Sequence, residues 1–225
     1  MTAGANRVPA AGFVLAGGQS SRMGRDKALE LLGGQRLIEI SLGALREAGV
    51  EAAIAGARSD LGGFGAVVED DEPDKGPLGG ICGALSSTSA ERALFVSVDL
   101  PLLPAALISY MVRHAGITSR AVTVCSVNGF SQTFPVVLDR AAMSILADRL
   151  NAGQSGCFAA FQAAAEALGE PVSVLSVEVL AQSGQVTHPS AVPPAWWFQN
   201  VNSPADLLRA ESIYRKFHSS PAVSQ

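Results

Sequence analysis

Short apolar runs alternate with segments of helical periodicity along most of this chain. A short, mostly apolar run bounded by Gly, Pro or charged positions is typical of a buried strand. The runs that predict strands are Gly12–Ala16, Ala52–Ala57, Ala66–Glu69, Ala93–Val98, Ala121–Val127, Phe134–Leu138 and Trp197–Val201.

The segments between these runs have helical patterns. Ile38, Leu42 and Leu45 are spaced i, i+4, i+7, Ala48 continues the same face, and Gly49 is placed to end the helix. Other segments combine good helix formers with recognisable ends, such as Ser203 as an N-cap before Pro204. Further predicted helices are Pro104–His114, Arg140–Leu150, Phe158–Leu168 and Pro204–Phe217.

The alternation of strands and helices predicts the fold class. It indicates an α/β protein, a single Rossmann-like domain whose mostly parallel central sheet has helices on both faces. We expect this domain to span residues 12–217, with a flexible N-terminal segment at 1–11 and a C-terminal tail at 218–225. The Pro- and Ser-rich segment Gln182–Ala195 predicts one surface excursion rather than a linker.

Composition and charge narrow the possible functions. The 225 residues are 48% hydrophobic and 16% charged, enough for one substantial core. A net charge of -4 and a pI near 5.4 argue against a nucleic-acid partner. No apolar run approaches the roughly 18 to 20 residues that span a bilayer, and the first ten residues lack the apolar core of a secretory signal. We therefore expect a cytoplasmic protein with no membrane association.

The cysteines and histidines form no recognisable metal or redox motif. Cys82, Cys125 and Cys157 are far apart in the sequence and lie in apolar settings, which predicts buried thiols in a reducing compartment. The three histidines are equally scattered.

Candidate chemistry lies just after the predicted strands, because open α/β sheets bind ligands beyond the carboxyl ends of their strands. After the first strand come Ala16-Gly17-Gly18 and then Arg22, Arg25 and Lys27. Glycines let a backbone approach a ligand and turn its N–H groups toward an anion, and the cations supply charge. Cations near a helix N-terminus are unfavourable because they oppose the helix dipole. Their presence here favours phosphate binding over the alternative, an ordinary turn followed by a solvated helix start.

Two later strand ends carry weaker signals. The acidic segment from Glu69 runs into Gly76-Pro77-Leu78-Gly79-Gly80, where a helix with a small-residue first turn suits close contact with a sugar or a flat ligand. The alternative is a solvated acidic loop. Asp99 ends a buried strand, where a carboxylate can hold a hard cation or merely cap a turn.

Together these segments resemble the molybdenum cofactor guanylyltransferases, a family of nucleotidyltransferases. The stretch LAGGQSSRMGRDKALELLGG, beginning at Leu15, is similar to the family signature nearly end to end. GPLGGI at Gly76–Ile81, SVDLPLLP at Ser97–Pro104 and FQNVNSPADL at Phe198–Leu207 follow in the family's order and spacing.

The resemblance implies transfer of GMP from GTP to the terminal phosphate of molybdopterin, with release of pyrophosphate and with Mg²⁺ as cofactor. It implies catalytic roles for Arg22, Lys27 and Asp99, with Asp99 also holding the metal, and acceptor binding by Asn200 and Asn202. Nucleotide contacts are implied for Leu15, Ala16, Gly17, Gly18, Lys27, Asp70, Pro77, Leu78, Gly79 and Asp99. Expected partners beyond GTP and molybdopterin are other cofactor-biosynthesis proteins and molybdoenzymes, and we expect a monomer or weak oligomer.

Two positions depart from the family pattern. Ala55 stands where some relatives carry Asn, and Phe134 stands where a polar residue or His is common, which affects the acceptor side most. Relatives that use CTP tend to have LAAG where this chain has LAGG, ending at Gly18. The LAGG pattern therefore predicts guanine as the base of the nucleotide. A CTP-dependent enzyme, a transferase with another nucleotide and another phosphate acceptor, and a nucleotide-binding module without catalysis remain as alternatives.

Overall fold

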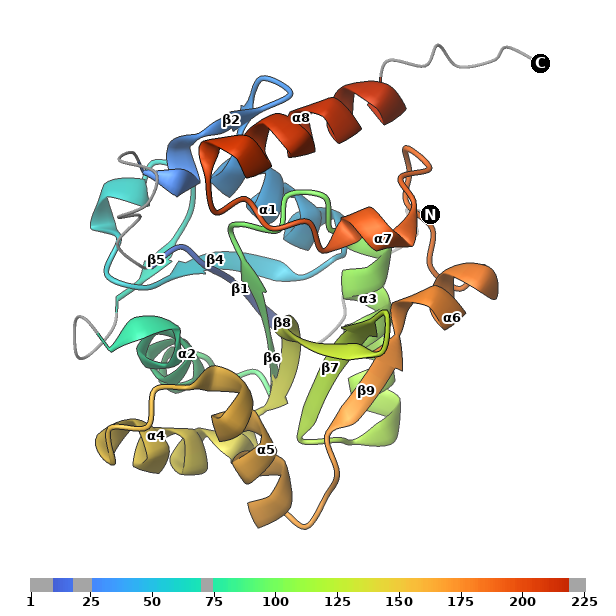
Figure 1. The fold of residues 1–225 in the computed structure, drawn as a ribbon. Helices are drawn as coiled ribbons and strands as arrows, with labels where there is room; N and C mark the ends of the chain where they lie inside the picture. Colours follow the sequence, from blue (N-terminus) through green and yellow to red (C-terminus); the bar gives the residue numbers. More distant parts are fainter. Residues whose placement is uncertain (1–9, 18–25, 70–74, 219–225) are drawn as a thin grey trace, which may run out of the picture.

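A seven-stranded sheet forms the centre of the computed structural model, which describes residues 10–17, 26–69 and 75–218 (Figure 1). Its strand order is β5-β4-β1-β6-β8-β7-β9. The strands are β1 (Ala11–Leu15), β4 (Glu51–Ala55), β5 (Val67–Val68), β6 (Arg92–Ser97), β7 (Val122–Val127), β8 (Phe130–Asp139) and β9 (Ser173–Ser176). A separate small hairpin pairs β2 (Leu31–Leu32) with β3 (Gln35–Arg36).

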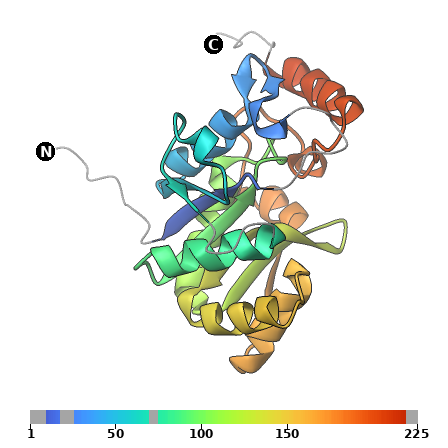
Figure 2. The same cartoon turned by 90° about the vertical axis from the view of Figure 1, so that its left-hand side faces the viewer.

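Helices cover both faces of the sheet, as predicted. One face packs against α2 (Gly76–Ser87), α4 (Met143–Asn151) and α5 (Cys157–Ala167). The other packs against α1 (Leu37–Glu47), α3 (Ala105–Thr118) and α6 (Val177–Gln182), and this layer continues into α7 (Pro194–Trp197) and α8 (Pro204–His218). The view in Figure 2 shows α8 beside the β2–β3 hairpin, far from α4 and α5.

The sheet is mostly parallel, and one strand runs the other way. β1 pairs in parallel with β4 and β6, whereas β8 is antiparallel to both of its neighbours, β6 and β7. Leu15 pairs with Ala55 on one side and with Ser97 on the other. The carboxyl ends of β1, β4 and β6 therefore stop at the same level, which is where such sheets bind ligands.

Alternating side chains on the central strands supply two separate cores. Val14 of β1 is buried on the α1 and α3 face, while Phe13 and Leu15 are buried on the α2 and α5 face. Phe13 stacks on Phe95 of β6 with ring centroids 5.4 Å apart. Both faces of these strands are buried, and this explains why their sequences are almost continuously apolar.

The prediction of a strand at Trp197–Val201 is wrong. Trp197 ends the short helix α7, and the chain then continues without regular structure to α8. The Trp197 side chain is buried, and its indole N–H donates to the carbonyl of Val192 at 2.7 Å. An apolar run this short is equally compatible with a buried helix turn.

The segment 182–195 runs along the surface as predicted, since most of its residues are exposed, but two of its side chains are buried. Val186 and Val192 from this segment are 1% and 2% exposed and belong to the core on the α1 face. The segment is therefore anchored by two apolar side chains that lie among its prolines and polar residues.

The structure also bears on the ends of the chain's elements, on the cysteines and on membrane association. β1 begins at Ala11 and α8 extends to His218. Cys125 is fully buried, whereas Cys82 and Cys157 are only partly buried, and all three are free thiols. Burial raises the pKa of Cys125 to about 12. Within the described ranges, no helix is both long and apolar enough to cross a membrane.

Candidate active site

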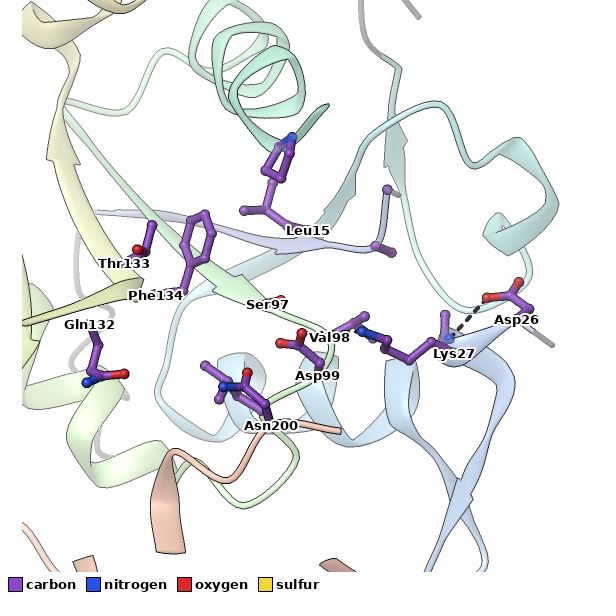
Figure 3. A pocket seen from close by; sticks show the side chains of 15 residues that line it. Leu15, Asp26, Lys27, Ser97, Val98, Asp99, Gln132, Thr133, Phe134 and Asn200 are labelled. Atoms are coloured by element: carbon purple, nitrogen blue, oxygen red, sulfur yellow. Dashed lines mark hydrogen bonds and ion pairs between the residues drawn. The ribbon is translucent and has the colours of Figure 1, made fainter. Parts of the chain in front are cut away.

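A cavity of about 400 Å³ opens at the carboxyl ends of β1 and β6 (Figure 3). Its walls come from the end of β1, the turn around Lys27, the start of α2, the end of β6, the first half of β8 and the segment before α8. The lining residues are Leu15, Ala16, Gly17, Asp26, Lys27, Ala28, Pro77, Ser97, Val98, Asp99, Leu100, Gln132, Thr133, Phe134 and Asn200.

Two glycines let the ends of β1 and β4 approach each other closely beside this cavity. Gly56 has φ of 124°, a backbone conformation that side chains rarely allow. A Cβ placed on Gly56 would lie 3.3 Å from the backbone nitrogen of Gly17. The glycine after Ala55 therefore leaves the backbone of Gly17 accessible at the cavity wall.

Among the residues that the structure describes, Lys27 brings a positive charge to the cavity lining. It begins a single 3-10 turn, Lys27–Leu29, whose N-cap is Asp26: the Asp26 carboxylate accepts a hydrogen bond from the backbone N–H of Ala28 at 3.0 Å. The Lys27 ammonium donates to the amide oxygen of Asn202 at 2.6 Å and lies 3.4 Å from Oδ2 of Asp99. Figure 3 shows its side chain directed toward Asp99.

Asp99 and the segment before α8 are tied together. Val201 donates its backbone N–H to the carbonyl of Asp99 at 2.9 Å. Asn202 donates its backbone N–H to the carboxylate of Asp206, which also accepts from the hydroxyl of Ser203 at 2.7 Å. These bonds hold Asn200 and Asn202 next to the end of β6, although they lie a hundred residues further along the chain.

Arg58 contacts the turn that carries Lys27 through the side chain of Asp26. Its guanidinium donates to the carbonyl of Ala16 at 2.9 Å, to the carboxylate of Asp26, and to both carboxylate oxygens of Asp60 at 2.9 and 2.8 Å. The hydrogen bonds that Asp60 accepts from Arg58 lower the pKa of Asp60 below its ordinary value. The Asp60 bond is also the main reason that the pKa of Arg58 is raised.

The wall opposite Lys27 comes from β8. Figure 3 shows Gln132, Thr133 and Phe134 across the cavity from Lys27 and Asp99. The ring of Phe134 makes an edge-to-face contact with Phe161 of α5, with centroids 6.3 Å apart. Phe134 therefore gives the cavity an apolar wall that is supported by the ring of Phe161.

The donor set at Asp99 fits a magnesium ion that a nucleotide brings with it. Mg²⁺ is usually held by one or two carboxylates together with phosphate oxygens and waters. Asp99 supplies a partly exposed carboxylate that faces the cavity. Across the described ranges, no group of three or more His, Cys, Asp or Glu side chains is arranged to hold a metal ion.

The predicted site residues have different positions in the structure. Leu15, Ala16, Gly17, Lys27, Pro77, Asp99 and Asn200 come together around the cavity. Leu78 and Gly79 are instead buried within α2, where Leu78 is part of the core. Gly18, Arg22 and Asp70 lie outside the residues that the structure describes.

Sequence reasoning missed Arg58, Gln132 and Thr133. The rule that ligands bind at strand ends applies to Arg58, because it follows β4 by three residues. For Gln132 and Thr133 there was no such signal, since they lie inside a strand whose first half extends beyond its predicted start.

Residues 12–182 match the family model of the MobA-like NTP transferase domain, which is most of the chain. The chain belongs to the MobA-like NTP transferase family. It is 31% identical over 215 residues to a protein of Haloferax mediterranei named probable molybdenum cofactor guanylyltransferase, covering 91% of this chain and 94% of that one. It is 42% identical over 106 residues to a molybdenum cofactor guanylyltransferase of Xanthomonas euvesicatoria pv. vesicatoria.

That second alignment covers 46% of this chain, and the chain spans about half (54%) of the Xanthomonas relative. Among solved structures, a molybdopterin-guanine dinucleotide biosynthesis protein A of Archaeoglobus fulgidus superimposes with a TM-score of 0.73. The superposition covers 92% of this chain and 99% of that one at 19% identity. At this identity the likeness shows a common fold, that of the MobA-like NTP transferases.

Proposed function

We propose that this MobA-like NTP transferase transfers GMP from GTP to the terminal phosphate of molybdopterin and releases pyrophosphate. The observation that carries the proposal is the contact of Lys27 with Asp99 and Asn202 at a cavity formed by the carboxyl ends of β1 and β6. The names of the Haloferax and Xanthomonas relatives support the choice of GTP and molybdopterin.

The nucleotide half of the site would use backbone and charge. Leu15, Ala16 and Gly17 offer a backbone surface without bulky side chains, and Lys27 supplies a positive charge for the phosphates. Pro77, the second residue of α2, lies at the cavity wall, and the buried Leu78 and Gly79 would contribute through the N-terminal backbone of this helix.

Asp99 is the residue that would hold Mg²⁺. When bound there together with GTP, the ion would neutralise charge on the α-phosphate and on the departing pyrophosphate. Lys27, which lies against the same carboxylate, would add a second positive charge. The amide oxygen of Asn202 accepts a hydrogen bond from the Lys27 ammonium and helps to hold it in place.

The acceptor half would lie along β8. A phosphate monoester is largely ionised at neutral pH, so its oxygen can attack the α-phosphorus without a protein base. Alignment and charge neutralisation then carry the reaction. Gln132, Phe134 and Asn200 face the cavity where the acceptor would lie, with Phe134 as a flat apolar surface.

A nucleotide panel followed by a product assay tests this function. Thermal unfolding with Mg²⁺ and each of GTP, CTP, ATP and UTP should show the largest stabilisation with GTP, because only a ligand of the native state raises its stability. Adding molybdopterin should release pyrophosphate and form a guanine dinucleotide. A shift with CTP as large as with GTP would overturn the choice of base. Tight GTP binding without pyrophosphate release would favour a binding module.

A further inference from the structure

Arg58 contacts both described ends of the loop between β1 and Lys27. Its Nη1 donates to the carbonyl of Ala16, the residue after β1, and its Nη2 donates to the carboxylate of Asp26, the residue before Lys27. The side chain is only 17% exposed. One guanidinium therefore connects the end of a central strand to the turn that carries Lys27.

The second half of this connection runs through Asp26. One oxygen of its carboxylate caps the 3-10 turn by accepting from the N–H of Ala28, and the other accepts from Arg58. The orientation of the turn that begins at Lys27 is therefore coupled to the position of Arg58. Asp60 fixes the other side of the guanidinium through two hydrogen bonds.

The contacts of Arg58 argue against a role as a phosphate ligand. A guanidinium has five N–H donors, and four hydrogen bonds to Ala16, Asp26 and Asp60 occupy four of them. Two carboxylates against one guanidinium also leave this cluster with a net negative charge, which repels phosphate. The cluster can act on a nucleotide only through the groups that it positions.

We propose that Arg58 is a positioning residue that sets the placement of Lys27 relative to the Ala16–Gly17 backbone, and thereby the binding of the nucleotide triphosphate. The inference rests on the proposed function only in that a nucleotide occupies the cavity. The planar fork of arginine serves four oxygen acceptors on three residues in fixed directions, and lysine offers a single point charge instead.

The test measures Mg-GTP affinity, KM for GTP and KM for the acceptor in four variants. Arg58→Met should weaken Mg-GTP binding by about tenfold or more, because hydrogen bonds to charged groups hold the turn. KM for GTP should rise in parallel, while KM for the acceptor stays unchanged. Arg58→Lys should not restore affinity. In the Arg58→Met background, Asp26→Asn should produce no further loss, although Asp26→Asn alone weakens binding.

The matched control is Arg46→Met. Arg46 also donates to a backbone carbonyl of a neighbouring loop, that of Phe64 at 3.2 Å, but it does not line the cavity. This variant should keep GTP affinity within about twofold of the unsubstituted protein.

Four results would overturn the inference. Unchanged GTP affinity in Arg58→Met, with or without a lower Tm, would leave Arg58 a purely structural role. Full rescue by Arg58→Lys would show that only its charge matters. Additive losses in the double variant would exclude the route through Asp26.

If Arg58→Met does not fold, the same comparison is made with Arg58→Lys. Failure of the unsubstituted protein to bind Mg-GTP would contradict the proposed function itself, and with it the premise of this inference.

Discussion

At the residue scale, the candidate site depends on one lysine held by two distant side chains. Asp99 and Asn202 are 72 and 175 positions from Lys27 in the sequence, and both contact its ammonium group. Neither bond can be inferred from local sequence, because each joins a different strand end or loop. Because Asp99 lines the cavity, removing its charge should affect the chemical reaction more than folding.

Asp99→Asn should lower the rate of pyrophosphate release by about a hundredfold or more, since loss of one electrostatic stabiliser raises a barrier by roughly 3 to 4 kcal/mol. Asn has nearly the same shape and keeps a hydrogen-bonding oxygen, but it does not carry the charge that attracts Mg²⁺. The assay is pyrophosphate release at several Mg²⁺ concentrations, with circular dichroism to verify the fold.

Asp148→Asn provides the control for this substitution. Asp148 is an exposed residue of α4, so the same chemical change there should leave the rate unaltered. Equal rates for Asp99→Asn and Asp148→Asn would exclude a catalytic or metal-binding role for Asp99.

At the element scale, α8 is joined to the β2–β3 hairpin by a close contact. The backbone N–H of Gly33 in the hairpin turn donates to the carboxylate of Glu211 at 2.9 Å. This hydrogen bond is the main cause of the lowered pKa of Glu211. A Cβ on Gly33 would lie 2.2 Å from a ring carbon of Tyr214, so any other residue at this position requires the Tyr214 ring or the hairpin to shift.

Gly33→Ala should destabilise the protein by about 2 to 3 kcal/mol, because a positive φ of 58° and a steric clash with Tyr214 act together. Gly34→Ala separates the two effects. Gly34 also has a positive φ, of 83°, but nothing lies within 4 Å of its added Cβ. We expect only about 1 kcal/mol for this variant. Urea unfolding of both variants measures the difference, and equal losses would show that Tyr214 moves away without penalty.

At the scale of the whole molecule, the two cores share the same strands. Successive residues of β1 and β6 point into opposite cores, so neither helical layer can separate without exposing the sheet. This arrangement predicts one cooperative unfolding transition, even though the hydrophobic side chains form two clusters.

Substitutions in either core should therefore weaken the same transition. Phe161→Ala on the α5 side and Leu107→Ala on the α3 side each remove a fully buried side chain and should lower the free energy of unfolding by about 3 to 5 and 2 to 5 kcal/mol, respectively. Fluorescence and circular dichroism should report coincident midpoints for each variant. Two separated transitions in either variant would show that the cores unfold independently.

Only Phe161→Ala should also change the cavity. Phe161 supports the ring of Phe134 in the cavity wall, whereas Leu107 lies in the opposite core. If the two variants lose the same stability, an effect on the acceptor that appears only in Phe161→Ala comes from the cavity wall. An effect common to both variants comes from general destabilisation.

The sequence alone determined the features that depend on local patterns. Apolar runs located β1, β4, β6 and β7, helical spacing located α1, and Ser203-Pro204 located the start of α8. The strand-end rule and the glycine turn pointed to Ala16, Gly17, Lys27 and Asp99, which the structure gathers around one cavity. These features follow from the sequence because burial and backbone conformation act on neighbouring residues.

Only the tertiary structure decided the rest. The edge strand β9 was missed because Leu175 is its one buried residue, and a strand with a single buried position has no apolar run to reveal it. Trp197 was assigned to a strand because short apolar runs do not distinguish a strand from a buried helix turn. The contacts of Arg58 with Ala16 and Asp26, and of Lys27 with Asn202, join segments far apart in the chain. Such contacts form only when the sheet brings its strand ends together, so no local pattern contains them.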